Sequence, residues 1–111
     1  VIDSLTALIM AMEKKEEVRA VLSIIQRLLR RLECTSIVIT ETPWGVESLG
    51  SGVEEFVVDG IIKMELVPFK GELKRRLTVL KMRGSSHETK YYQYNIVPND
   101  GIVITPYPEV F

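Results

Sequence analysis

Residues 81–87 read KMRGSSH and close a segment that the sequence predicts to be a β-hairpin. Apolar and β-branched residues are frequent in 59–69 and 73–82, which predicts two strands, and the Lys-Gly-Glu run between them predicts the turn. Side chains two positions apart on a strand point to the same face, so Lys81 and Arg83 are expected to lie side by side.

The hairpin is also the most basic part of the chain. Residues 70–90 contain seven of the 14 lysines and arginines and only two acidic residues, although the net charge of the whole chain is −1. Such a charge run often does no more than keep a sheet edge solvated. The charge alone therefore leaves two interpretations open, a solvated edge and an anion-binding surface.

The residues around the hairpin predict an α/β fold. Residues 1–3 resemble the end of a strand, and the apolar run at 36–40 predicts a buried parallel strand. Between them, apolar residues recur at spacings of three and four from 18 to 32, which predicts an amphipathic helix. After the hairpin, residues 91–97 and 102–105 predict a second pair of strands around an Asp-Gly turn. The expected fold class is part of a parallel sheet with flanking helices, followed by antiparallel β-hairpins.

Both predicted parallel strands end on residues suited to a ligand. Asp3 ends the first strand, and Thr40 and Glu41 end the second. In nucleotide-binding sheets the carboxyl ends of parallel strands border the ligand crevice, and an aspartate there can hold Mg²⁺ beside the phosphates. An aspartate after a strand also caps many helices, and a strand end often meets only water, so both roles remain open at this point.

The KMRGSSH stretch resembles the Lys-(Leu/Met)-Arg-Gly-(Ser/Thr)-x-His signature of the KaiC family, a branch of the RecA-like ATPases. Residues 1–6 resemble the Walker B segment of that family, residues 52–59 resemble the segment after its mobile loop, and Gly71-Glu72 resembles its hairpin turn. Several matches in the right order are more specific than any one of them. The resemblance covers nearly the whole chain.

The resemblance implies a domain that assembles into ring-shaped homo-oligomers, hexamers in the family, with ATP and Mg²⁺ at each subunit boundary. Asp3 would be the Walker B metal ligand. Lys81 and Arg83 would reach the ATP of a neighbouring subunit in trans, in the manner of an arginine finger.

The resemblance also implies contacts to the rest of the nucleotide. Met82, Ser85 and His87 would line the adenine and ribose side. Asn99 falls near an aspartate of the family after a one-residue difference in length. The remaining candidates at the nucleotide are Thr40 and Glu41.

The sequence departs from the family at several points. The phosphate-binding pattern GxxxxGK[ST] is absent, and so are the catalytic glutamates that lie upstream of Walker B in the family. Residues 1–111 are therefore expected to be the C-terminal half of a RecA-like domain, and to hydrolyse no ATP alone. Glu55 and Phe56 stand where the second domain of the clock protein carries its phosphorylated Ser-Thr pair, so the chain resembles the first domain, which does not autophosphorylate. A single-domain relative of the clock protein is the expectation.

Two other functions remain open from the sequence. One is a non-enzymatic interaction module that keeps the fold and the subunit interface without a nucleotide. The other is a nucleic-acid-binding protein, because RecA relatives bind DNA through loops in the region of 43–52. That region carries Glu47 and no lysine or arginine, which weakens the second alternative. Trp44 in the same region suits either base stacking or an apolar lid.

The composition excludes several other classes of protein. A single cysteine, Cys34, excludes a disulfide framework, and its position beside an apolar run predicts that it is buried. His87 is the only histidine, and it cannot build a metal site with one distant cysteine. No apolar run approaches the ~20 residues of a membrane span, and no signal-peptide pattern occurs. A cytoplasmic protein without membrane partners is the expectation.

Overall fold

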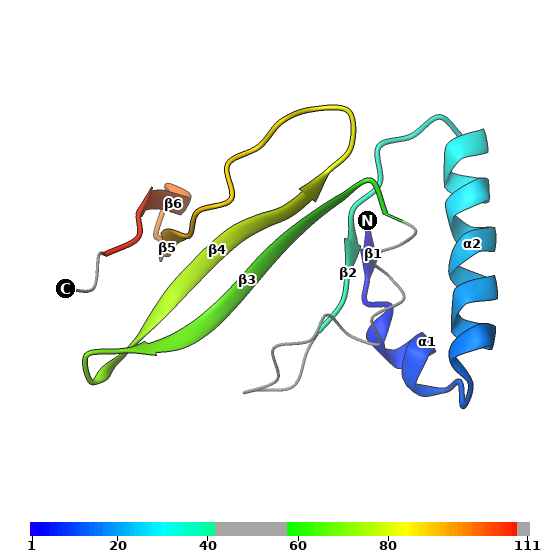
Figure 1. The fold of residues 1–111 in the computed structure, drawn as a ribbon, viewed down its shortest axis with the longest axis horizontal. Helices are drawn as coiled ribbons and strands as arrows, with labels where there is room; N and C mark the ends of the chain where they lie inside the picture. Colours follow the sequence, from blue (N-terminus) through cyan, green and yellow to red (C-terminus); the bar gives the residue numbers. More distant parts are fainter. Residues whose placement is uncertain (42–57, 109–111) are drawn as a thin grey trace. The chain divides into compact units, whose positions relative to one another are not determined.

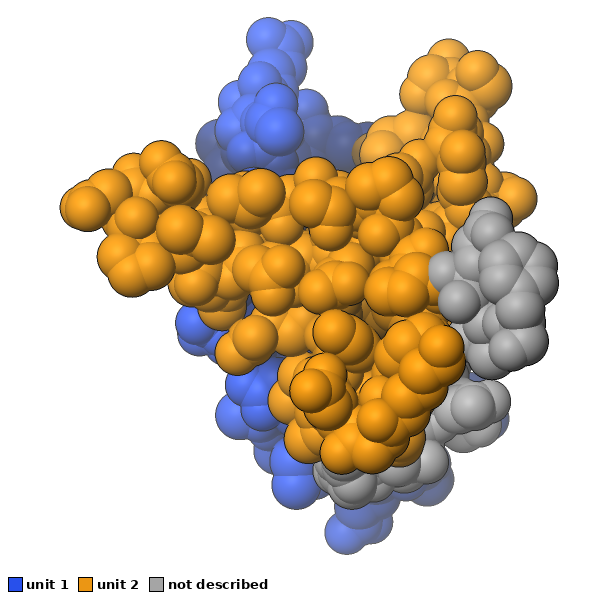
Figure 2. Space-filling model, turned by 90° about the vertical axis from the view of Figure 1, so that its left-hand side faces the viewer, with its two compact units in different colours: residues 1–58 blue, residues 59–111 orange. Residues whose placement is uncertain are grey.

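A computed structural model describes residues 1–41 and 58–108. The chain divides into two compact units, unit 1 comprising residues 1–58 and unit 2 comprising residues 59–111 (Figure 2). The predicted loop at 43–52 with Trp44, and the positions of Glu55 and Phe56, lie outside the described residues.

The described residues of unit 1 form two short strands and two helices in the order β1 (Ile2–Asp3), α1 (Thr6–Met10), α2 (Lys15–Arg31) and β2 (Val38–Ile39) (Figure 1). β1 and β2 pair in parallel, with Ile2 opposite Val38 and Asp3 opposite Ile39. The strand–helix–strand connection predicted from the sequence is therefore confirmed, with the main helix starting three residues earlier than the apolar pattern indicated.

The core of unit 1 lies where α2 covers α1 and the two strands. Leu5, Val18 and Leu22 are its buried apolar residues, and Ile2 and Val38 pack against them. The helix carries acidic residues in its first turn and basic residues in its last turn, an arrangement that complements the helix dipole. Amphipathic packing thus places α2 against Ile2 of β1 and Val38 of β2, the two strands that lead to Asp3 and to Thr40 and Glu41.

Two predictions about burial in unit 1 are wrong. Within the run at 36–40 only Val38 and Ile39 form a strand, and Ile37 is 61% exposed. Cys34 is exposed rather than buried, with its thiol 3.7 Å from the carbonyl oxygen of Leu29. Both residues are exposed because little of the described chain covers this region. Among the described residues, β2 has one strand neighbour, and the helices pack on a small apolar core.

Unit 2 is a four-stranded antiparallel sheet in the order β3 (Gly60–Phe69), β4 (Glu72–Met82), β5 (Tyr92–Val97) and β6 (Gly101–Pro106) (Figure 1). Its strands match the predicted hairpins to within one residue at each end. A parallel sheet with helices followed by antiparallel hairpins is the predicted fold class, and it is confirmed. No helix among the described residues is both long enough and apolar enough to cross a membrane.

The long β3–β4 hairpin contains one irregularity, close to the KMRGSSH stretch. Ile62 pairs with Val79 and Ile61 pairs with Lys81, so Leu80 is an extra residue in β4. A bulge of this kind bends the strand and changes the direction of the side chains that follow it. The irregularity therefore lies immediately before Lys81 and Arg83.

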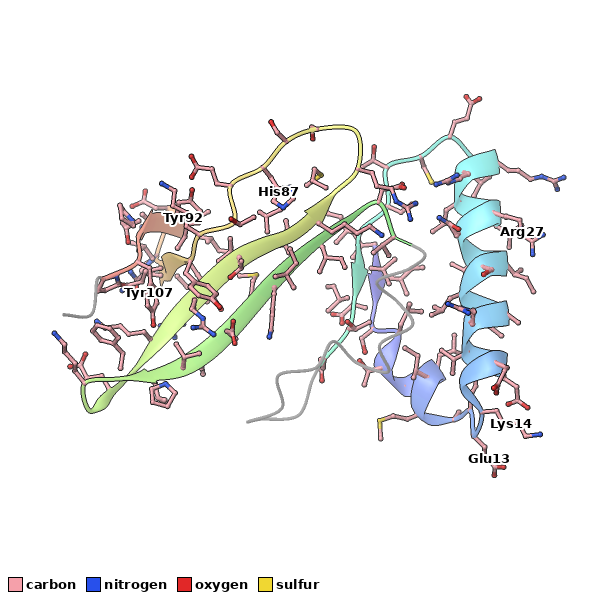
Figure 3. All side chains as sticks on the ribbon, in the orientation of Figure 1. Glu13, Lys14, Arg27, His87, Tyr92 and Tyr107 are labelled. Atoms are coloured by element: carbon pink, nitrogen blue, oxygen red, sulfur yellow. The ribbon has the colours of Figure 1, made fainter. Side chains whose placement is uncertain are left out.

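Aromatic and charged side chains connect the β3–β4 hairpin with the segment that follows β6. The rings of Phe69 and Tyr107 lie 5.8 Å apart, and those of Tyr91 and Tyr107 lie 6.1 Å apart. The Arg76 guanidinium lies 4.0 Å from the centre of the Tyr91 ring and 3.1 Å from a Glu65 carboxylate oxygen. These contacts tie the segment after β6 to the hairpin, and Figure 3 shows Tyr107 on that segment. Tyr91 therefore contacts both the hairpin and the segment after β6.

The turn between β5 and β6 explains why Asn99 suits its position. Its φ angle is 71°, and Gly101 follows with a φ angle of 77°. This left-handed conformation costs most residues energy, but asparagine and glycine adopt it readily. The conformation accounts for an asparagine at position 99 without a ligand, and the nucleotide contact inferred from the family remains a prediction.

The Asn99 turn yields the first testable prediction. Asn99→Ala is expected to lower the free energy of unfolding by about 1 kcal/mol, because alanine is strained at positive φ. Asn99→Gly should retain the stability to within about 0.5 kcal/mol. Urea unfolding followed by circular dichroism measures both values. Equal losses for the two variants would show that the asparagine side chain, and not the backbone angle, stabilises the turn.

Candidate functional site

The first group of candidate residues lies at the carboxyl ends of β1 and β2. Asp3 is the last residue of β1 and pairs with Ile39, the last residue of β2, and Thr40 and Glu41 follow directly. All three candidate side chains are exposed. Because the strands are parallel, the structure brings Asp3, Thr40 and Glu41 to one edge of the sheet, as the sequence predicted.

Sequence analysis missed the residue that connects these two strand ends. The Glu41 backbone N–H donates a hydrogen bond to Thr6 Oγ1 at 2.8 Å, and the Leu5 N–H donates to the Ile39 carbonyl oxygen at 2.9 Å. The segment that follows Asp3 is thus joined twice to the end of β2. The connection spans 35 residues of sequence, and the only local sign of it was a threonine at the start of an apolar helix.

The hydroxyl of Thr6 gives the second prediction. Thr6→Val removes the acceptor while keeping a similar shape, and is expected to lower the free energy of unfolding by about 1 kcal/mol. Thr6→Ser keeps the hydroxyl and should lose less than half of that. The comparison is made by urea unfolding, and a larger loss for the serine variant would mean that the methyl group of Thr6 matters more than its hydrogen bond.

The donor chemistry at this edge fits Mg²⁺ as a partly hydrated ion. Asp3 offers an exposed carboxylate, and Mg²⁺ typically takes one or two protein carboxylates while water and phosphate oxygens complete its octahedron. In the described part of the chain no three His, Cys, Asp or Glu residues lie close enough together to hold a metal by themselves. The residues therefore suit a metal that arrives with a phosphate ligand, and do not form a closed protein cage.

The second group lies at the end of the β3–β4 hairpin in unit 2. Lys81 pairs with Ile61 near the end of β4, and its side chain is partly buried. Arg83 lies one residue beyond the strand, but its N–H donates to the carbonyl oxygen of Asp59 at 2.8 Å, so the pairing continues through it. The guanidinium Nη1 of Arg83 lies 3.4 Å from Asp59 Oδ1, and the two side chains are 47% and 67% exposed.

The rest of the KMRGSSH stretch turns away from the sheet. Gly84 has a φ angle of 78°, a conformation that glycine tolerates and that ends the strand. Ser85 is exposed, and His87 is partly buried on the loop between β4 and β5 (Figure 3). Met82, exposed at the last position of β4, lies opposite Gly60. Lys81, Met82, Arg83, Ser85 and His87 are thus grouped at one end of the sheet, whereas Asn99 belongs to the separate β5–β6 turn.

The loop after the stretch is fixed by an acidic residue. The Tyr92 hydroxyl donates to Glu88 Oε2, and Lys90 Nζ lies 3.3 Å from the same oxygen. The hydrogen bond from Tyr92, together with Lys90, lowers the pKa of Glu88, and the same hydrogen bond raises the pKa of Tyr92. Glu88 therefore carries its charge at neutral pH and holds the chain where the loop enters β5.

Comparison with known proteins gives a consistent result. Residues 1–109 match the family model described as "ATPase: KaiC". The chain is 38% identical over 105 residues to a UPF0273 protein of Methanocaldococcus jannaschii, and the match covers 95% of this chain and 42% of that protein. It is also 37% identical over 110 residues to the circadian clock oscillator protein KaiC 1 of Synechocystis, of which the match covers 20%.

A solved structure agrees with the sequence matches. The crystal structure of a KaiC-like protein from the hyperthermophilic archaeon Pyrococcus horikoshii superposes with a TM-score of 0.78 at 37% identity, covering 95% of this chain and 45% of that one. The chain thus spans less than half of the length of these relatives. The matched share is larger for the UPF0273 and KaiC-like proteins than for the clock protein. With a family model that matches almost its full length, the chain belongs to the KaiC family of ATPases.

Proposed function

We propose that residues 1–111 form the C-terminal half of a RecA-like ATPase domain that binds ATP at the boundaries between subunits of a ring. In this proposal Asp3 serves the nucleotide of its own subunit, whereas Lys81 and Arg83 serve that of the neighbour. The observation that carries the proposal is the place of Arg83, just beyond the end of β4, with its side chain about half exposed. Membership of the KaiC family supports nucleotide binding.

The position of Arg83 differs from that of Arg76 on the same hairpin. Arg76 is held on the sheet by Glu65 and by the ring of Tyr91. Arg83 lies outside the strand, before a glycine with positive φ, and belongs to the most basic stretch of the chain. A long cationic side chain at a strand end can reach a ligand on another subunit, which a side chain packed on the sheet cannot do.

Most of the candidate site residues would have a defined role at the nucleotide. Asp3 would hold Mg²⁺, which when bound neutralises negative charge on the phosphates. Lys81 and Arg83 would stabilise the charge that develops on the transferred phosphoryl group of the neighbour. Thr40 and Glu41 would border the phosphates from the end of β2, and Met82, Ser85 and His87 would contact the adenine and ribose.

The same proposal assigns no independent activity to residues 1–111. The phosphate-binding loop and the catalytic glutamate would come from the preceding half of the domain, and the term "complete domain" refers below to both halves together. A cytoplasmic ring of identical subunits is part of the proposal, and a hexamer is its expected form.

Mixing two inactive variants of the complete domain tests the trans assignment. One subunit carries Arg83→Ala with an intact phosphate-binding loop, and the other carries a disabled loop with Arg83 unchanged. Mixed rings contain boundaries that combine both functional halves, so ATP hydrolysis should partly recover. If mixed rings form, as native mass spectrometry can establish, and no activity returns, Arg83 does not act in trans.

A further inference from the structure

Asp59 contacts Arg83 through both its backbone and its side chain. Its carbonyl oxygen accepts the Arg83 N–H at 2.8 Å, and its Oδ1 lies 3.4 Å from Arg83 Nη1. Asp59 precedes β3 and Arg83 follows β4, so the two residues face each other at the open end of the hairpin. One residue therefore fixes where the Arg83 backbone lies and restrains where its guanidinium points.

The exposure of this pair argues against a role in stability. The side chains of Arg83 and Asp59 are 47% and 67% exposed, and ion pairs with that exposure contribute little to folding because water screens them. The Glu65–Arg76 pair of the same hairpin is different, since its side chains are only 20% and 22% exposed and Tyr91 covers the guanidinium. The Glu65–Arg76 pair on the sheet thus suits structural support. The Asp59–Arg83 pair lies just beyond the ends of β3 and β4 and does not serve that purpose.

We propose that Asp59 is a positioning residue for Arg83. An arginine side chain has many rotamers, and a partner carboxylate reduces the number that it samples. A guanidinium that is already oriented loses less conformational entropy when it contacts the transition state than one that samples many rotamers. This inference rests on the proposed function, because orienting Arg83 matters for turnover only if Arg83 acts on a nucleotide.

Substitution of Asp59 in the complete domain tests the inference. Asp59→Asn keeps the size of the side chain and the backbone hydrogen bond but removes the charge. It is expected to lower kcat for ATP hydrolysis about 10-fold, since misplacement of a catalytic group is costly, while KM for ATP changes by less than about twofold. Ring assembly and Tm should not change. Asp59→Glu restores a carboxylate and should recover part of the loss.

Glu65→Gln provides the matched control. It also removes a carboxylate that pairs with an arginine of the β3–β4 hairpin, but on the face of the sheet. It is expected to lower Tm and to leave kcat per assembled ring unchanged. A similar loss of kcat in Glu65→Gln would mean that the activity responds to any weakening of the hairpin, and the positioning role would be overturned.

The mixing experiment locates the effect of Asp59 in a subunit. Asp59→Asn should lower the recovered activity when it is placed in the subunit that supplies Arg83, and should have no effect in the subunit that supplies the phosphate-binding loop. An equal loss in both placements, or an increase of kcat, would refute positioning. If Arg83→Ala abolishes turnover while Asp59→Asn leaves kcat unchanged, the proposed function stands and only this inference fails.

Discussion

Arg83→Ala in the complete domain is expected to lower the turnover number for ATP hydrolysis by about 10³-fold, the lower end of the range for removal of an arginine that stabilises phosphoryl transfer. The physical reason is the loss of a delocalised cation with fixed donors close to the charge that develops in the transition state. The loss should appear mainly in kcat, because an interaction formed only in the transition state contributes little to ground-state binding. Steady-state kinetics with purified rings measures both constants.

The free energy of unfolding of the Arg83→Ala variant distinguishes a catalytic role of Arg83 from a structural one. The bond from the Arg83 backbone to Asp59 does not depend on the side chain, and the ion pair is exposed, so the free energy of unfolding should change by less than about 0.5 kcal/mol. Arg75→Ala is the matched control, since Arg75 is an exposed arginine of the same strand. Equal losses of turnover in the two variants would assign the effect to the overall basic charge of the hairpin.

The elements with long, regular patterns could be predicted from the sequence. The apolar spacing from Val18 to Leu32 indicated α2, because a helix with one buried face repeats every three to four residues. The turn at Lys70 and Gly71 indicated the hairpin, and both residues indeed have positive φ. Such features depend on residues that are close in sequence, so a short stretch of sequence is enough to predict them.

The missed features depend on contacts between distant residues. The hydrogen bond from Glu41 to Thr6 and the ion pair between Asp59 and Arg83 arise from strand register, which no local pattern encodes. The exposure of Cys34 follows from how much of the fold covers β2, which an apolar run alone does not reveal. Sequence analysis thus identified Arg83 as a candidate, and the structure supplied its partner.

Asp3→Asn is expected to lower the turnover of the complete domain by about 10²-fold or more at saturating ATP, since a bound metal supplies several kcal/mol of charge stabilisation. The half-saturating Mg²⁺ concentration should rise as well, because asparagine is a neutral ligand and binds a hard cation more weakly than a carboxylate does. Titration of ATP hydrolysis with Mg²⁺, at fixed ATP and ionic strength, measures both effects.

Glu13→Gln is the control for Asp3→Asn, because Glu13 is an exposed carboxylate at the bend between α1 and α2 of the same unit (Figure 3). It removes the same charge from unit 1 without changing the edge formed by β1 and β2, so the Mg²⁺ titration should match that of the unmodified domain. The position of Asp3 explains the expected contrast, since it ends a strand whose parallel neighbour leads directly into Thr40 and Glu41. If Asp3→Asn lowers turnover but leaves the Mg²⁺ dependence unchanged, the aspartate acts on the structure of that edge and not on the metal.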